Sequence, residues 1–280
     1  YAIPLAWHIQ LKWMEKTQWK WTWLQCVHLI VLLLTHAYLG AIAAAFAGLI
    51  AGFHVLFNWK STIRLTVRLL QIATASVLPL IAYIALLKTS DNHPFRTDQP
   101  YGFWDNISTW NAALLPSHGG FGIARREFGW GLNAWEGWGF WGAGTWLVIL
   151  VFIAEYLRRS NPRLRTINWA IVLVAFSSIT LYAIGAGEPF LTGKNQWLEK
   201  WPLFMQFRAI GRFVWPAAWA MPVLAALGCF HLATVPRLKW LPYIFVGMFA
   251  LDAFWMQQEC KKEMQTQQNC FASVDTELQA

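Results

Sequence analysis

The chain has 280 residues, of which 57% are apolar and only 13% are charged. This composition is typical of a polypeptide surrounded by lipid and excludes an ordinary soluble globular protein. The net charge of +8 does not indicate a nucleic-acid-binding protein, because the basic residues gather in short clusters between apolar segments instead of forming a stripe with interleaved aromatics. Membrane lipids, and no nucleic acid, are therefore the expected partners.

The first residues, 1–7, contain neither an initiator methionine nor a signal peptide, and their composition is that of the end of a helix. We therefore expect the chain to be part of a larger membrane enzyme, without its N-terminal portion. Further membrane subunits are possible partners.

Apolar segments of the length needed for a transmembrane helix, roughly 20 residues for hydrocarbon of about 30 Å, recur along the chain. They predict an all-α polytopic bundle in a transmembrane domain at 1–258, followed by a polar tail at 259–280. The predicted spans are 21–39, 41–58, 69–87, 138–157, 167–184, 213–233 and 240–258.

Basic residues gather in four of the intervening segments, and cytoplasmic loops retain Lys and Arg. The tail and the two long segments, 88–137 and 185–212, then share the opposite side, which is the periplasm if the protein lies in a bacterial inner membrane. The aromatic residues of 88–137 favour short helices on the membrane surface over a solvated linker. The basic segments are 8–20, 59–68, 158–166 and 234–239.

Four cysteines are present. Cys26 and Cys229 fall in apolar segments and are expected to be small core residues. Cys260 and Cys270 lie in the polar tail and would pair if that tail faces an oxidising compartment.

The first two spans are separated only by Gly40, which predicts a tight helical hairpin with its tip on the outer side. His36 and Tyr38 lie near this tip, where both can donate hydrogen bonds to a sugar or a phosphate. The alternative for His36 is a hydrogen bond with a neighbouring backbone group.

The sequence EGWGFWGAG at 136–144 leads into the predicted fourth span. Its glycines permit close approach of a neighbouring helix or a ligand. Glu136 is a candidate catalytic or acceptor-binding residue, and its alternative role is to cap the N-terminus of the fourth span.

Arg208 and Arg212 lie four residues apart in FRAIGRFVWP at 207–216, so an α-helix would place them on one face. Two guanidiniums at the headgroup boundary can clamp a phosphate, because each presents a planar fork of donors. The alternative is that both anchor the helix end to lipid phosphates.

These three motifs together resemble a group of bacterial multi-spanning membrane proteins of largely uncharacterised function, which is similar to the GT-C class of glycosyltransferases. The resemblance covers residues 20 to 258 and implies a polyprenyl-phosphate-linked sugar donor and a periplasmic acceptor. It implies that Arg208 and Arg212 bind the donor phosphate and that His36, Tyr38 and Glu136 lie near the sugar or acceptor. It also implies a catalytic carboxylate in a region preceding Tyr1.

Two other functions stay open. His28 and His54 lie about equally far from Gly40 and would suit a bis-His haem protein. A transporter or non-catalytic subunit of a membrane assembly is the other alternative, although Glu155 and Asp252 are predicted near helix ends and give no intramembrane proton relay. The motifs themselves indicate no cofactor and no metal site, although a divalent metal is compatible with the GT-C resemblance.

Overall fold

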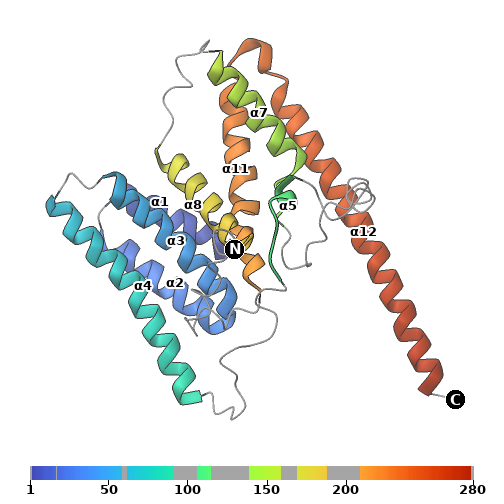
Figure 1. Cartoon of the computed structure of the whole chain (residues 1–280), viewed down its shortest axis with the longest axis horizontal. Coiled ribbons are helices and arrows are strands. Elements are labelled where there is room, and N and C mark those ends of the chain that lie inside the picture. The colour runs from blue at the N-terminus through green and yellow to red at the C-terminus, as the bar shows by residue number, and fades with distance from the viewer. Residues whose placement is uncertain are drawn as a thin grey trace.

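The structure, a computed structural model, describes residues 2–16, 18–58, 62–90, 106–114, 139–158, 169–187 and 209–278. Within these ranges every regular element is helical (Figure 1). The elements are α1 (Ala2–Glu15), α2 (Trp19–Thr35), α3 (Ala37–Phe57), α4 (Thr62–Ser90), α5 (Asn111–Leu114), α7 (Ala143–Leu157), α8 (Trp169–Gly185), η3 (Ile210–Val214), α11 (Trp215–Leu232), η4 (Pro236–Leu238) and α12 (Leu241–Leu278).

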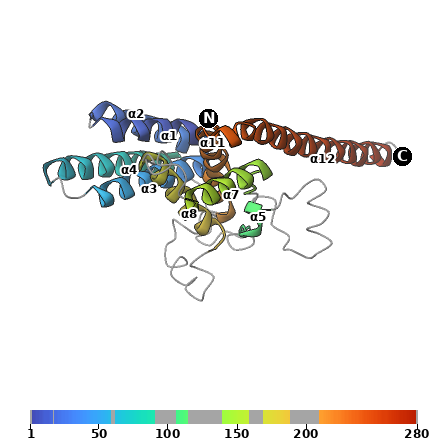
Figure 2. The same cartoon turned by 90° about the horizontal axis from the view of Figure 1, so that it is seen from above.

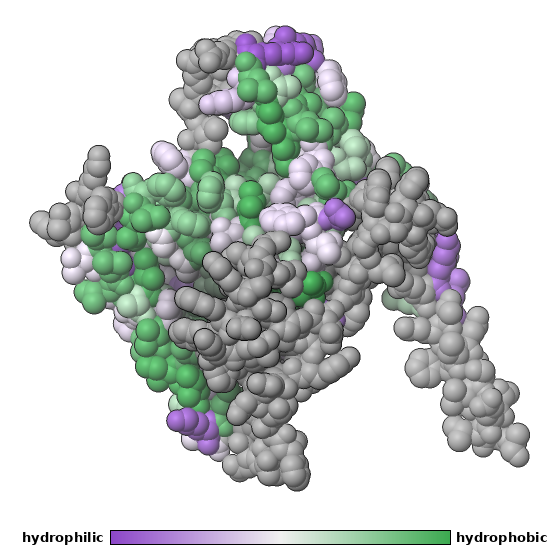
Figure 3. Space-filling model, in the orientation of Figure 1, coloured by the Kyte–Doolittle hydropathy of each residue, from purple (hydrophilic) through white to green (hydrophobic). Residues whose placement is uncertain are grey.

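Three helical stretches of the described chain are long and apolar enough to cross a membrane: Ala37–Phe57, Leu65–Thr89 and Ile210–Leu232. Two shorter apolar helices, α7 and α8, accompany them. On the face shown in Figure 3 the described surface is largely apolar, with hydrophilic residues near η4, at the far end of α4 and along α12. These features indicate a membrane protein.

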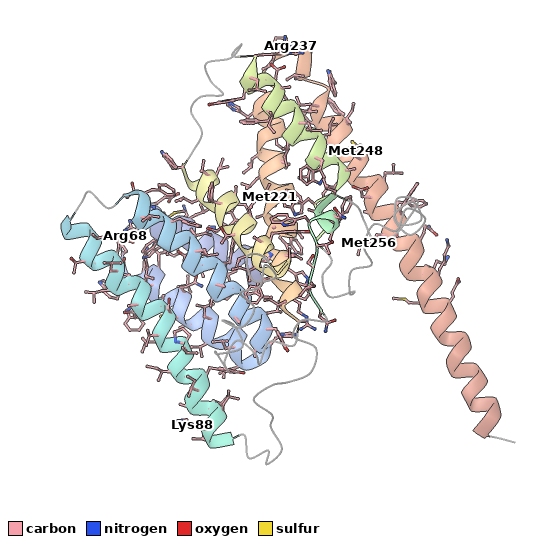
Figure 4. All side chains as sticks on the ribbon, in the orientation of Figure 1. Arg68, Lys88, Met221, Arg237, Met248 and Met256 are labelled. Atoms are coloured by element: carbon pink, nitrogen blue, oxygen red, sulfur yellow. The ribbon has the colours of Figure 1, made fainter. Side chains whose placement is uncertain are left out.

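Consecutive helices run in alternating directions (Figure 1). The turn between α2 and α3 and the C-terminus of α4 lie at one end, called the hairpin end. The start of α4 and η4 lie at the other, called the η4 end. Figure 4 shows Arg68 and Lys88 near opposite ends of α4, and Arg237 at the η4 end.

The core lies where α1, α3, α8 and α11 meet, around the buried residues Ile3, Phe46, Leu181 and Phe213. In Figure 2 α1 and α2 form one layer and α3 and α4 the next. A second cluster, which includes Val148, joins α7 to α11 and α12. The bundle is therefore continuous from α1 to α12.

The prediction of a basic loop at 8–20 is wrong for most of that segment. Helix α1 continues to Glu15 and buries Ile9, Gln10 and Trp13. The guanidinium of Arg68 lies 4.3 Å from the centroid of the Trp13 ring and donates to the backbone oxygens of Trp13, at 2.6 Å, and Met14, at 3.1 Å. A cation at a helix C-terminus satisfies carbonyls that have no partner within the helix.

The hairpin turns at His36, and the prediction of Gly40 as the break is wrong. Gly40 lies inside α3, where an added Cβ would stand 2.7 Å from the backbone nitrogen of Leu33. The glycine therefore lets α2 and α3 approach closely.

Helix α7 begins at Ala143, five residues later than the predicted span. Its N-terminus is capped from α12, because the Ala143 N–H donates to Asp252 Oδ2 at 2.9 Å. Gly142 precedes the helix with a φ of 90°, which favours glycine. Glu136, the residue predicted as an alternative cap of this helix, lies outside the described residues.

The close approach predicted for the glycine-rich segment is confirmed at Gly139 and Gly144. An added Cβ at Gly139 would stand 2.7 Å from the Tyr182 ring, and one at Gly144 would stand 3.1 Å from the Phe245 backbone oxygen. Helices α8 and α12 thus pack directly against this backbone.

The polar tail predicted at 259–280 is helical through Leu278 and continues α12, which has 38 residues. Asp252 therefore lies inside a helix and not near its end. The side chains of Cys260 and Cys270, whose pairing stays a prediction, lie outside the described part of the structure. Cys26 and Cys229 are free and buried, as predicted.

Candidate functional site

The hairpin tip presents His36 and Tyr38 at the hairpin end. His36 is the N-cap of α3, and its Nδ1 accepts a long hydrogen bond of 3.4 Å from the Leu39 N–H. The proton of a neutral His36 ring therefore belongs on Nε2, which can donate outward from this exposed side chain. The backbone role predicted for His36 and a donor role for Nε2 are compatible.

Arg212 reaches this tip from a part of the chain more than 170 residues away. Its guanidinium carbon lies 4.7 Å from the centroid of the Tyr38 ring and 5.7 Å from that of Trp215. The His36 and Tyr38 rings are 6.3 Å apart. We call His36, Tyr38, Arg212 and Trp215 the arginine–aromatic cluster.

The backbone around Arg212 is fixed on two sides. The Gly211 N–H donates to the Asn106 oxygen at 2.8 Å. An added Cβ at Gly185 would stand 2.9 Å from the Val214 backbone nitrogen, so η3 packs directly on the end of α8. Ile210, Phe213 and Val214 are buried, and Arg212 is the residue of η3 that is left half-buried.

The segment 106–114 covers the ends of α7 and α8. The Tyr182 hydroxyl donates to the Thr109 oxygen at 2.8 Å, and the Trp110 ring stacks on Tyr182 at 5.1 Å. The Trp146 indole donates to the Ala113 oxygen at 2.7 Å. This described part of 88–137 is therefore folded against the bundle, as its aromatic content predicted.

A guanidinium held near aromatic rings is well suited to binding an anion. Rings attract the cation through their faces, whereas the N–H donors lie in the guanidinium plane and point past the rings. The cluster adds the Tyr38 hydroxyl and the His36 ring as further polar groups. Its chemistry is that of a phosphate or carboxylate site with neighbouring donors for hydroxyl groups.

A model of the family described as a domain of unknown function, DUF6311, matches residues 2–254. The chain belongs to this family. The match includes the whole arginine–aromatic cluster and α1 through the first part of α12. Neither the curated proteins nor the solved structures gave a match to the chain.

The structure brings together three of the predicted site residues, His36, Tyr38 and Arg212. Arg208 and Glu136 lie outside the described residues. The α-helical spacing argument for the two arginines is wrong, because Arg212 lies in a 3-10 helix that begins at Ile210. Trp215 belongs to the motif at 207–216 but was not predicted as a site residue, and its place three residues after Arg212 was the available signal.

The haem alternative is wrong because the hairpin turns at His36. His28 lies eight residues before the turn and His54 eighteen after it. Their depths below the tip are therefore about 12 Å and about 27 Å. Two axial ligands of one haem would have to lie at the same level.

Proposed function

We propose that this protein is the donor-binding portion of a GT-C-like membrane glycosyltransferase, which transfers a sugar from a polyprenyl-phosphate-linked donor to a periplasmic acceptor. The observation that carries the proposal is the position of the Arg212 guanidinium, 4.7 Å from the Tyr38 ring at the tip of a helical hairpin. The donor phosphate would bind Arg212, with Arg208 four residues earlier as the second cation.

The neighbourhood of Arg212 suits a phosphate that carries a long hydrocarbon chain. Arg212 belongs to η3, which directly precedes α11, and lies within the apolar stretch Ile210–Leu232. Trp219, Val223 and Leu227 follow Trp215 at intervals of four residues and are all exposed, so they share one face of α11. An apolar track thus runs from the cluster along the helix, and a polyprenyl tail can lie on it.

The charge of Arg212 suits the reaction as well as the binding. When the glycosidic bond to the phosphate breaks, the leaving polyprenyl phosphate gains negative charge. A fixed guanidinium then stabilises the transition state more than the ground state. His36 and Tyr38 would orient sugar hydroxyls, and Glu136 remains the candidate acid or base within this chain.

The proposal includes a topology in which α2, α3, α4, α7, α8, α11 and α12 cross a bacterial inner membrane with the hairpin end in the periplasm. Single cysteines at Thr89 and Thr234 test it, because both side chains are exposed and lie at opposite ends of the bundle. A membrane-impermeant maleimide should label Thr89→Cys in spheroplasts and Thr234→Cys only after lysis. Equal labelling of both in intact spheroplasts would refute the topology.

Donor binding is tested with purified protein in nanodiscs, titrated with a short-chain polyprenyl phosphate and with the polyprenol of the same length. Native mass spectrometry measures the bound fraction. The phosphate should bind at least about tenfold more tightly than the alcohol, and Arg212→Ala should remove most of this difference. Arg212→Lys should restore part of it, since Lys keeps the charge and loses the fork.

Lys88→Ala is the matched control, because Lys88 is an exposed cation at the same end of the bundle and outside the cluster. It should bind both lipids as the wild-type protein does. Equal affinity of the wild-type protein for phosphate and alcohol would overturn the proposal. Phosphate-selective binding without sugar transfer by the full enzyme would identify a non-catalytic lipid-binding subunit instead.

A further inference from the structure

Four uncharged polar side chains are buried among the first four helices, on a part of the bundle that the arginine–aromatic cluster does not use. They are Gln10 of α1, Thr22 and Gln25 of α2, and Gln71 of α4, with 5%, 2%, 1% and 0% of their surface exposed. They line a cavity that α3 closes with Ala47 and Gly48.

The polar atoms in this cavity lack partners within the described protein. Both ends of the Gln25 carboxamide, the Gln10 Oε1, the Thr22 hydroxyl and the Gln71 Nε2 are buried and without a hydrogen bond there. The Gln71 Oε1, by contrast, accepts from the Trp13 indole at 3.0 Å. Each buried polar group without a hydrogen bond lowers the free energy of unfolding by about 1–3 kcal/mol. Here several such groups face the same small cavity.

The cavity has the size and the chemistry for water. About 20 Å³ is open to the centre of a water molecule, and one water needs roughly 10–15 Å³ by that measure. Water both donates and accepts, and so do the atoms that face the cavity. A cation fits poorly, because carboxamide and indole N–H groups share the lining and the Arg68 guanidinium lies 4.3 Å from the neighbouring Trp13 ring.

We propose that this cavity is an internal water site, in which bound water hydrogen-bonds Gln10, Thr22, Gln25 and Gln71 and thereby joins α1, α2 and α4. The water replaces direct hydrogen bonds between the side chains of these helices. Apolar packing alone would not fix the position of one helix along its neighbour. The site is independent of donor binding at the hairpin end.

Water-edited solid-state NMR tests the proposal on the wild-type protein in lipid, with 15N-labelled glutamine. The side-chain amide of Gln25, assigned by its loss in Gln25→Met, should receive magnetisation from water as quickly as exposed glutamines do. No transfer to the Gln25 and Gln71 amides in the folded wild-type protein would overturn the proposal.

A pair of glycines on α3 supplies a matched control. An added Cβ at Gly48 or at Gly52 meets nothing within 4 Å, but only Gly48 lines the cavity, and Gly52 is exposed. Gly48→Leu should expel the water, abolish the transfer to Gln25 and lower the Tm below that of Gly52→Leu. If the cavity is dry, Gly48→Leu should instead have the higher Tm of the two variants, because the leucine would then fill a void.

The Gln25→Met variant gives a second test, in which the direction of the change in Tm decides. If water satisfies the carboxamide, its replacement removes real hydrogen bonds and lowers the Tm by a few degrees. If the carboxamide is unsatisfied, an apolar side chain of similar length raises the Tm, and that result would also overturn the proposal.

Discussion

The two 3-10 helices that flank α11, η3 and η4, carry arginines in different environments. At the hairpin end the Arg212 guanidinium lies over the aromatic ring of Tyr38. At the η4 end the Arg237 guanidinium bonds Glu155 Oε2 at 2.6 Å, and Arg158 adds a second contact of 3.3 Å to the same carboxylate. The Glu155 side chain is only 3% exposed.

The difference suggests two roles: Arg237 stabilises the fold, whereas Arg212 is the arginine proposed to bind a ligand. A carboxylate neutralises the charge of an arginine and accepts from its N–H donors, whereas an aromatic face attracts the guanidinium without neutralising its charge. Stability should therefore depend on the η4 end, and activity on the hairpin end.

The largest effect is expected for Arg212→Ala in the full-length enzyme. Loss of a charge-assisted contact to a developing anion should lower turnover by one to a few powers of ten, with little change in the Tm. Arg212→Lys should recover part of the rate. Normal activity per folded molecule in Arg212→Ala, together with poor membrane insertion, would make Arg212 an anchor and remove the contrast between the ends.

Glu155→Ala should give the converse result. It leaves two arginines facing a buried site without their carboxylate, so unfolding should become easier by about 2 kcal/mol, measured as a lower Tm in lipid or detergent. Turnover per folded molecule should stay normal. Arg158→Ala, whose side chain is 64% exposed, should cost only about 0.5 kcal/mol, and an equal cost for the two variants would contradict this assignment.

Asp252→Ala tests whether every charge near the hairpin end serves the ligand. Its carboxylate caps α7 through the Ala143 N–H, so the variant should lose about 1 kcal/mol of stability. Asp252→Asn should keep most of that stability, because an amide oxygen still accepts. Loss of activity at unchanged stability would place Asp252 in the site.

The smallest effect is expected at Tyr38. Tyr38→Leu removes the ring under Arg212 and should weaken polyprenyl phosphate binding by about 0.5–1 kcal/mol, as native mass spectrometry would measure. Tyr38→Phe keeps the ring and should bind nearly as the wild-type does. If Phe and Leu weaken binding equally, the hydroxyl and not the ring face is the important group.

Hydropathy predicted where the helices of the bundle lie, because lipid requires long apolar segments whatever their partners. It missed the second half of α1, because residues 1–7 were expected to end a helix and the following residues, with Gln10 and Lys12, lack the apolar length of a span. The turn at His36 depends on a backbone conformation and a local cap, and Gly40 gave a misleading signal because its role is contact between helices.

The candidate site was predictable only in part. The sequence singled out Arg212, Tyr38 and His36 separately, but no pattern indicated that η3 would bring Arg212 to the hairpin tip. The isolated glutamines of α1, α2 and α4 carried no signal either, since each is polar alone on its own helix. Their meeting is a property of the tertiary packing.

Helix α12 has 38 residues, which corresponds to a rod of about 57 Å. Hydrocarbon about 30 Å thick accounts for only the first half of this length. In the proposed topology the remainder extends roughly 27 Å beyond the hydrocarbon, so that its outer part stands above the headgroups. A soluble acceptor that contacts the far part of this helix would therefore be kept away from the headgroups. The length of α12 would set the distance between the acceptor and the membrane.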